Sequence, residues 1–352
     1  MTQASDHSYT PSFTVRKSPG AGQGAFAVRE ITAGTVILRA DKLTAHVILR
    51  EYRGEVCWEC FAYDRGRKLV LRDQTRGFTF CSQRCESVFL KRGNDGVCLE
   101  AWAAVEKSSK LKSRAPEDGA EEGTNNMTQG DKKPTAVDID DAWHAAAPSA
   151  ASIVEARARG PQAAKVHKRA LQQALSSPPP PDILNFQTHA ILTQYTDPVS
   201  WESILSLAHE PCPYASWQEL DHHIKSYLHL LAILPETLLP LTNDQTLRTI
   251  KCREVHNSFG IRSLEDGGSE FFGFGVWPCA SYFNHSCLPN VTRRRVGRTW
   301  VFQARGDVRD GQELYISYLN GEEDTLATAE RRARLRKHWG FECACERCRG
   351  AV

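Results

Sequence analysis

The sequence predicts an α+β fold in which short strands near both ends of the chain enclose a cysteine-bearing segment and a helical insert. Near the start, residues 25–31 are strand-like, residues 32–34 form a turn, and residues 35–38 are β-branched and apolar. Short strands and turns resume at about residue 256 and continue to Tyr318. Between them, a helix with a core-facing stripe is indicated by the i, i+3, i+4, i+7 spacing of Ile224, Tyr227, Leu228 and Leu231.

The composition is that of an ordinary globular chain and favours no particular partner. Of 352 residues, 41% are hydrophobic, and 44 basic side chains against 42 acidic ones leave a net charge of +2. The polar N-terminus lacks the apolar region of a signal peptide, and no apolar run reaches membrane-spanning length. Basic clusters at 293–298 and 331–337 are interpreted as a solvated strand end and the wet face of a helix, with a docking surface as the alternative. We therefore expect neither a membrane partner nor direct binding of nucleic acid.

The middle of the chain is predicted to be irregular. Residues 107–135 are polar and charged with hardly an apolar side chain, which predicts disorder. Residues 140–175 are alanine-rich and favour helices, which we expect to be interrupted at Pro148, Gly160 and Pro161. The prolines at 178–181 predict a stiff spacer. Further on, a charged helix is predicted over residues 325–338, closed by a left-handed cap at Gly340.

Twelve cysteines in a chain without a secretion signal indicate free thiols or metal ligands rather than disulfides. Two close pairs, Cys57-x2-Cys60 and Cys81-x3-Cys85, are separated by twenty residues. Four thiolates suit tetrahedral Zn²⁺, and each pair lets one short loop supply two ligands. The alternative is a set of buried free cysteines, but this segment has little core-forming sequence of its own. The spacing therefore predicts a zinc site.

A second group lies near the C-terminus, where Cys343, Cys345 and Cys348 place three thiolates within six residues. Tetrahedral zinc then needs a fourth ligand from elsewhere in the chain. The spacing alone leaves five candidates, Cys98, Cys212, Cys252, Cys279 and Cys287.

Four motifs, in the expected order, resemble those of SET-domain methyltransferases. NHSCLPN at 284–290 matches the NHSCxPN signature, and DGQELYISY at 310–318 resembles the second SET signature. FECACERC at 341–348 resembles the post-SET motif, and GAGQGAFA at 20–27 resembles the glycine-rich opening motif. The glycine motif alone could indicate a dinucleotide-binding fold, but a strand-like run follows it where that fold requires a helix.

The cysteine segment divides the SET domain after its opening strands, as in the SET and MYND family. The resemblance implies a β-rich SET fold with small twisted sheets and a pseudoknot, split by a zinc-binding MYND-like insertion and a helical insert. The implied segments are an N-terminal SET part at 12–50, a degenerate MYND-like finger at 51–105, a low-complexity or helical insertion at 106–181, a helical SET insert with the start of the core at 182–275, the SET core at 276–320, and the post-SET helix and zinc motif at 321–352.

Two features depart from that family. Its finger holds two cross-braced zinc ions, but here no second CxxC lies between Cys60 and Cys81. Asn94, four residues before Cys98, also stands where the closing histidine belongs. We therefore expect a half-finger with one zinc. Because the sequence ends at Val352, the long helical C-terminal domain of the animal members is expected to be missing, and the chain resembles the shorter fungal SET proteins.

The resemblance implies S-adenosylmethionine as cofactor and a protein lysine as substrate. The loop Gly22-Gln23-Gly24 would approach the cofactor through its backbone, because glycine has no Cβ. Asn284 and His285 would hold the cofactor mainly through main-chain contacts. The further cofactor contacts implied are Asn257 and Phe341, the latter against the adenine. Cys287 would complete the C-terminal zinc site with Cys343, Cys345 and Cys348, which brings the expected total to two zinc ions.

Tyr318 is the candidate catalytic residue, because its hydroxyl can orient the amine or the methyl group without being a strong base. Positioning should contribute much of the rate of an in-line methyl transfer. The candidate walls of the substrate channel are Phe259, Tyr282, Phe283 and Trp339. Each has core packing as its alternative, and for Tyr282 and Phe283 the two interpretations balance. Trp339 stands where the family usually has tyrosine, which leaves the number of transferred methyl groups open.

Two other interpretations remain. A catalytically inactive SET scaffold could use its zinc-stabilised fold to bind proteins, but intact motif residues such as Asn284 and Tyr318 favour an enzyme. A purely structural zinc protein would leave those two residues without a reason. We expect a monomer in the nucleus, the cytoplasm or both, acting on a histone or another lysine-bearing protein.

Overall fold

The computed structural model describes residues 12–112, 133–265, 268–319 and 321–350. The chain divides into two compact units, one made of Met1–Lys42 and Trp277–Val352 and the other of Leu43–Val276. The first unit therefore combines the two ends of the sequence, and the second is a single long excursion between them. The predicted charged helix and all the motifs from residue 284 onward belong to the first unit.

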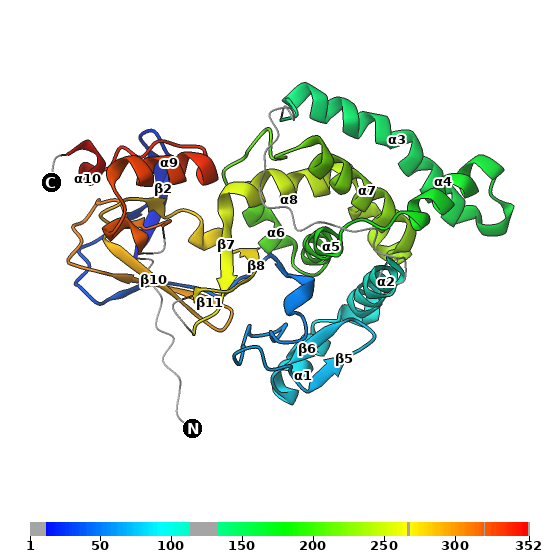
Figure 1. Cartoon of the computed structure of the whole chain (residues 1–352), viewed down its shortest axis with the longest axis horizontal. Coiled ribbons are helices and arrows are strands. Elements are labelled where there is room, and N and C mark those ends of the chain that lie inside the picture. Colours follow the sequence, from blue (N-terminus) through cyan, green and yellow to red (C-terminus); the bar gives the residue numbers. More distant parts are fainter. Residues whose placement is uncertain (1–11, 113–132, 266–267, 320, 351–352) are drawn as a thin grey trace. The chain divides into compact units, whose positions relative to one another are not determined.

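The first unit is built from short strands in three small sheets. Its strands are β1 (Phe13–Ser18), β2 (Gly22–Ala27), β3 (Val36–Ala40), β9 (Asn284–His285), β10 (Val291–Val296), β11 (Thr299–Ala304) and β12 (Tyr315–Ile316). They form the antiparallel hairpin β1–β2, the antiparallel sheet β10–β11–β3, and the parallel pair β9–β12. Because β3 pairs with β11, strands from opposite ends of the sequence share one sheet (Figure 1). This confirms the predicted β-rich α+β fold.

The helical elements of the first unit follow its last strands. They are η6 (Pro278–Ala280), η7 (Glu322–Asp324), α9 (Thr328–Trp339) and α10 (Glu346–Arg349). The Glu330 carboxylate accepts a hydrogen bond from the Ala327 backbone at the start of α9. Gly340 ends α9 with φ of 74°, a left-handed conformation that favours glycine. The predicted cap at Gly340 is thus confirmed, although the helix begins three residues later than expected.

The second unit combines one sheet with a set of helices. The sheet contains β4 (Ala45–Ile48), β7 (Ser258–Arg262) and β8 (Phe271–Val276) in the antiparallel order β4–β8–β7. The longer helices are α5 (Pro181–Thr196), α6 (Pro198–Leu205), α7 (Trp217–Ile233) and α8 (Asp244–Asn257), with the short η4 (Glu236–Leu241). Among the described helices, none combines the length and the hydropathy needed to cross a membrane.

The cysteine segment forms a small finger inside the second unit. Its elements are η1 (Arg50–Tyr52), β5 (Leu71–Asp73), β6 (Phe78–Phe80), α1 (Gln83–Lys91), η2 (Asn94–Gly96) and α2 (Val97–Lys112). The finger has an aromatic core in which the ring of Trp58 stacks on Phe78 with centroids 3.9 Å apart and meets the edge of Trp102 at 5.5 Å. This core holds the loop that carries the first cysteine pair against the β5–β6 hairpin.

The insertion contains more helix than the sequence predicts. The prediction of disorder is wrong for residues 107–112, which continue α2, and for Thr135, which caps α3. Residues 113–132 of that prediction lie outside the described residues. The prediction of an interruption at Pro148 is wrong, because α3 (Ala136–Arg159) runs through it as one helix. A proline inside a helix costs about 3 kcal/mol, but α3 buries a regular apolar face that offsets this cost. That face consists of Ile139, Trp143, Ala146, Ala150, Ile153 and Ala156. The helix does end at Gly160, as predicted, before η3 (Gly160–Gln162) and α4 (Lys165–Ser176).

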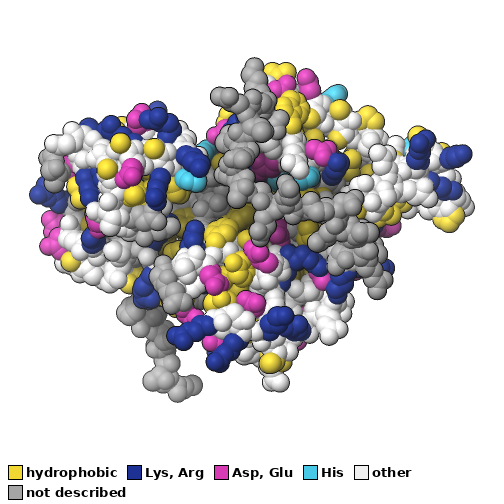
Figure 2. Space-filling view, viewed as in Figure 1, with side chains coloured by type: hydrophobic (Ala, Val, Ile, Leu, Met, Phe, Trp, Pro, Cys, Tyr) yellow, Lys and Arg dark blue, Asp and Glu magenta, His cyan; other side chains and the backbone are white. Residues whose placement is uncertain are grey.

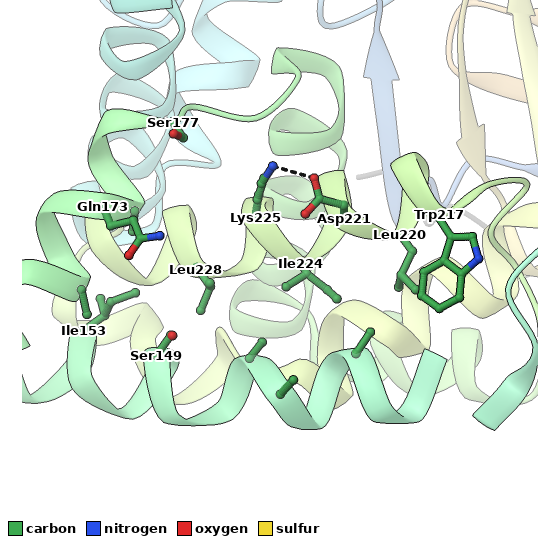
Figure 3. Close-up of a pocket in the computed structure, with 15 residues that line it drawn as sticks. Ser149, Ile153, Gln173, Ser177, Trp217, Leu220, Asp221, Ile224, Lys225 and Leu228 are labelled. Carbon is green, nitrogen blue, oxygen red and sulfur yellow. Dashed lines mark ion pairs between the residues drawn. The ribbon is translucent and has the colours of Figure 1, made fainter. Parts of the chain in front are cut away.

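Helices α3, α4 and α7 of the second unit enclose a cavity of about 460 Å³ (Figure 3). Ile224 and Leu228, from the predicted core stripe, line this cavity, whereas Tyr227 and Leu231 of the same stripe are buried. The Lys225 ammonium and Asp221 carboxylate form an ion pair of 2.6 Å at its wall. No residue predicted to bind the cofactor or zinc lines this cavity.

Candidate active site and metal centres

The parallel pair β9–β12 brings the NHSCLPN motif beside the second SET signature. Asn284 pairs with Tyr315 and His285 with Ile316, and the Ser286 backbone donates to the Ile316 carbonyl at 3.0 Å. Because the two strands run in the same direction, the residues that follow each of them emerge at the same end of the pair. This places Tyr318 next to His285.

His285 has a hydrogen-bonding arrangement that fixes its tautomer. The Tyr318 backbone N–H donates to His285 Nδ1 at 3.0 Å, so Nδ1 must accept and Nε2 must carry the hydrogen. Nε2 lies 3.4 Å from Cys287 Sγ and donates to that sulfur. Burial, helped by the positive charges of Arg293 and Arg331, lowers the pKa of His285 to about 4. His285 is therefore a neutral link between Tyr318 and Cys287.

Tyr318 presents its hydroxyl in a defined direction. The hydroxyl donates to the Phe283 carbonyl at 3.1 Å. Burial raises the pKa of Tyr318 to about 12, although the nearby Arg293 opposes that shift. The hydroxyl therefore stays protonated at neutral pH. It can orient a reacting group through its oxygen lone pairs, but it does not supply a strong base.

Aromatic rings from three segments surround Tyr318. The ring centroid of Trp339 lies 5.4 Å from that of Tyr318, and Phe341 meets Tyr318 edge-on at 6.3 Å. Phe341 also lies 6.0 Å from the His285 ring. The left-handed turn at Gly340 separates Trp339 from Phe341 and lets both face Tyr318. The structure thus brings together four of the residues that the sequence singled out.

The C-terminal centre consists of Cys287, Cys343, Cys345 and Cys348, whose sulfur atoms all lie within 4.8 Å of one another. Cys287 Sγ lies 3.9 Å from Cys343 Sγ and 3.6 Å from Cys348 Sγ. Zn–S bonds of about 2.3 Å in a tetrahedron place sulfurs about 3.8 Å apart. The geometry therefore fits zinc, and Cys287 is the fourth ligand that the spacing of the other three left open.

The finger centre consists of Cys57, Cys60, Cys81 and Cys85, again within 4.8 Å of one another. Cys81 Sγ lies 3.5 Å from Cys60 Sγ and 3.6 Å from Cys85 Sγ, which also fits tetrahedral zinc. The hydroxyl of Ser82 caps α1 by accepting from the Cys85 backbone, which orients the second pair. Across the described residues these are the two groups with metal-ligand geometry, in agreement with the predicted half-finger and the total of two zinc ions.

A metal assay on purified protein should accordingly find two zinc ions per chain. Each centre has four thiolates at tetrahedral spacing and no excess ligand. Mass spectrometry of the native protein, before and after acid denaturation, measures this stoichiometry directly. A count of three would indicate a second zinc in the finger, and a count of zero would contradict both centres.

Asn284 belongs to a hydrogen-bond network that joins the opening motif to both SET signatures. Its side-chain amide donates to the Gln23 carbonyl at 3.1 Å and to Glu313 Oε1 at 2.8 Å. Glu313 Oε2 in turn accepts from the hydroxyls of Ser18, at 2.9 Å, and Tyr315, at 2.7 Å. The Asn284 side chain is thus engaged within the protein, while its main chain belongs to the β9–β12 pair.

Gly24 lies so close to this network that a side chain at this position would collide with it. A Cβ at this position would lie 2.4 Å from Glu313 Oε1 and 2.8 Å from Asn284 Nδ2. Gly22, two residues earlier, has φ of 76° and open space around it. Gln23, between the two glycines, is exposed, and its carbonyl oxygen accepts the hydrogen bond from the Asn284 amide.

The remaining predicted residues have different environments. Phe283 is 1% exposed, stacks on Phe302 at 4.4 Å and meets the edge of Phe13 at 5.2 Å, which favours core packing over a channel wall. Tyr282 is half-buried, and its carbonyl accepts from the Ala25 backbone at 2.9 Å. Asn257 and Phe259 both belong to the second unit, where they are buried. The Asn257 amide donates to the carbonyls of Ala208, at 2.9 Å, and Arg253, at 2.6 Å.

Two residues of the site, Glu313 and Arg331, were not predicted from the sequence. Glu313, the hub of the network around Asn284, is the acidic residue of the Gly-x-Glu-Leu core, so the motif itself was the available signal. Arg331 was interpreted as part of a wet helix face, and this interpretation is wrong because its side chain is buried and donates to Cys348 Sγ. The available signal was its i, i+4 spacing from Leu335, the one leucine of α9.

Comparison with known proteins agrees with this geometry. A sequence profile of the SET domain matches residues 22–319. The chain is 28% identical over 381 residues to a potential protein lysine methyltransferase, SET6, of Saccharomyces cerevisiae, covering 98% of this chain and 97% of the yeast protein. Shorter matches include a SET and MYND domain-containing protein of Dictyostelium discoideum, 36% identical over 30% of this chain and 26% of that protein. The human histone-lysine N-methyltransferase SMYD3 is 40% identical over 27% of this chain and 21% of its own length. The sequence resemblance is confirmed: the chain belongs to the SET domain family.

Proposed function

We propose that this chain is a protein-lysine N-methyltransferase that uses S-adenosylmethionine, with its active site around Tyr318. The main support is a chain of hydrogen bonds that runs from the Tyr318 backbone through the His285 ring to Cys287 of the C-terminal centre. Family membership supports the reaction class, as does the yeast relative described as a potential protein lysine methyltransferase, which aligns over nearly its whole length. A metal centre that only stabilised the fold would need no such connection to a half-buried tyrosine.

The residues that would hold the cofactor surround the β9–β12 pair. Gly22, Gln23 and Gly24 would contact it through their backbone, together with the main chain of Asn284 and His285. The side chain of Asn284 already bonds Gln23 and Glu313, which supports a main-chain role. Phe341, half-buried beside His285, would lie against the adenine. Asn257 is proposed as a further cofactor contact on the motif resemblance alone. When bound, S-adenosylmethionine would supply an electrophilic methyl group for the lysine nitrogen and leave as the neutral thioether.

The protein contributes by holding a neutral lysine amine in line with the methyl carbon and the sulfur of the cofactor. A lysine arrives with a pKa near ~10.4 and must lose a proton to solvent before it can react. An apolar environment of aromatic rings lowers that pKa by disfavouring the charged form. Trp339 and Tyr282 are candidate walls of this environment. Phe259 is proposed as a further wall on the motif resemblance alone. The Tyr318 hydroxyl, held by the Phe283 carbonyl, then orients the amine.

The substrate we propose is a lysine in a histone or another protein, methylated by a monomer of this chain in the nucleus or the cytoplasm. Incubation with methyl-labelled cofactor, a histone mixture and a whole-cell lysate should transfer label to at least one protein band. Calorimetry with the cofactor alone should independently show binding. Binding without label transfer would favour the inactive scaffold, and failure of both measurements would contradict the proposal.

A further inference from the structure

Arg331 differs from the other basic residues of α9 because it is buried. Its side chain is 3% exposed, whereas Arg334, Arg336 and Lys337 of the same helix are exposed. One guanidinium nitrogen, Nη2, lies 3.7 Å from Cys348 Sγ and 3.1 Å from Thr328 Oγ1. The other, Nη1, donates to the Leu326 carbonyl at 2.7 Å. The guanidinium therefore joins the start of α9 to the C-terminal centre.

The C-terminal centre carries a charge that must be balanced. Four thiolates around Zn²⁺ leave a net charge of two minus, and a buried net charge is unfavourable unless it is paired. Cys287 is 1% exposed, Cys343 is 3% exposed and Cys348 is 6% exposed. These sulfurs share an apolar cluster with Leu319 and Leu335. Water cannot screen most of the charge at this centre.

Two side-chain N–H groups from different segments donate to sulfur atoms of this centre. His285 Nε2 donates to Cys287 Sγ, but its Nδ1 accepts from the Tyr318 backbone N–H and carries no hydrogen, so this imidazole contributes no charge. Arg331 donates to Cys348 Sγ and contributes a positive charge. Hydrogen bonds that involve a charged donor and acceptor are roughly twice as strong as neutral ones. Arg331 is thus placed to stabilise the metal-bound form in particular.

We propose that Arg331 is the charge-balancing positioning residue of the C-terminal zinc centre, and that it fixes α9 on the metal by donating to the Cys348 thiolate. This inference rests on the zinc centre of the proposed function but not on methyl transfer itself. Its consequence is that the metal holds Trp339, at the end of α9, in place through Arg331 as well as through the cysteines. The alternative is that the Arg331 stem merely fills space under the helix.

Arg331→Met tests the proposal because it keeps the apolar stem and removes the charged donors. Zinc release is followed with a colorimetric chelator on the holoprotein, which carries both centres. We expect one of the two zinc ions to be released about ten to a hundred times faster than in the parent protein. The finger zinc should keep its rate and so serve as an internal reference. The Cys81→Ser background, which leaves the C-terminal centre as the remaining four-cysteine site, assigns the faster phase.

Two further variants separate charge from packing. Lys337→Met removes an exposed positive charge from the same helix and should leave both release rates unchanged. Arg331→Lys keeps the charge without the planar fork and should release zinc at an intermediate rate, which also covers the case that Arg331→Met fails to fold. The proposal is overturned if Arg331→Met releases both ions at the parent rates or accelerates both equally. Equal rates for Arg331→Lys and Arg331→Met would also overturn the charge-balancing role.

Because the readout is zinc release, the result is independent of whether a substrate has been found. Selective release from Arg331→Met in a protein that labels nothing would support this inference while the proposed function failed. Label transfer with unchanged zinc release would support the proposed function and overturn this inference.

Discussion

Replacing Tyr318 with phenylalanine should slow methyl transfer by about a hundredfold and leave cofactor affinity within about twofold, because a misplacement of the reacting groups by about 1 Å can cost that much in rate. The change removes one oxygen atom and keeps the ring. Contacts of that ring with Trp339 and Phe341 should persist. The bond from residue 318 to His285 Nδ1 also persists, because its donor is the backbone.

The measurement is the initial rate with labelled cofactor and the identified substrate, together with calorimetry of cofactor binding. Tyr195→Phe is a matched control, since it removes the same atom from α5 of the second unit, whereas Tyr318 belongs to the first unit. Equal rates for Tyr318→Phe and the parent protein would remove Tyr318 from the catalytic role. A fall in zinc content would show instead that the variant had damaged the C-terminal centre.

The pH profile provides a further check on the same residue. The raised pKa of Tyr318, about 12, means that the hydroxyl remains neutral as pH rises through 10.0, the ordinary value for tyrosine. The parent protein should therefore not lose activity through ionisation of this tyrosine near that pH. Its rate should instead rise with pH as the substrate lysine loses its proton.

Features that depend on local spacing could be predicted from the sequence. The finger centre was predicted because Cys57 and Cys60 lie on one short loop and Cys81 and Cys85 on another, so few conformations are needed to assemble it. The left-handed cap at Gly340 follows from the lack of a Cβ at that position. Cys287 is a distant ligand, and it was identified by its motif rather than by spacing.

Features that depend on tertiary packing could not be predicted. Helix α3 continues through Pro148 because its buried face, including Trp143 and Ile153, packs in the second unit, and local propensity carries no information about that packing. Arginine is rarely buried, so the sequence places Arg331 in solvent; the acceptors that explain its burial, among them Cys348 Sγ and the Leu326 carbonyl, are brought to it by tertiary packing. Phe283 had two balanced interpretations until its stacking on Phe302 was known.

Cys343→Ser should reduce the zinc content from two to one per chain and abolish cofactor binding. Serine is not ionised at neutral pH and cannot replace the thiolate as a ligand. Structural zinc sites contribute about 10–16 kcal/mol in model peptides, which is comparable to the whole stability of a domain, about 5–15 kcal/mol. The segment that carries Phe341 would then depend on apolar contacts with Leu319 and Leu335 and on hydrogen bonds such as the one from Arg336 to Glu342.

Cys81→Ser in the finger is the control that isolates this effect. It also removes one thiolate and should also leave one zinc ion per chain, but its centre belongs to the second unit. We expect it to retain cofactor binding, because Tyr318, His285 and Phe341 are all held within the first unit. Native mass spectrometry and calorimetry on both variants decide the question. If Cys343→Ser bound the cofactor as tightly as Cys81→Ser, the C-terminal metal would be a distant support for the fold, and the connection through His285 would have no role in the active site.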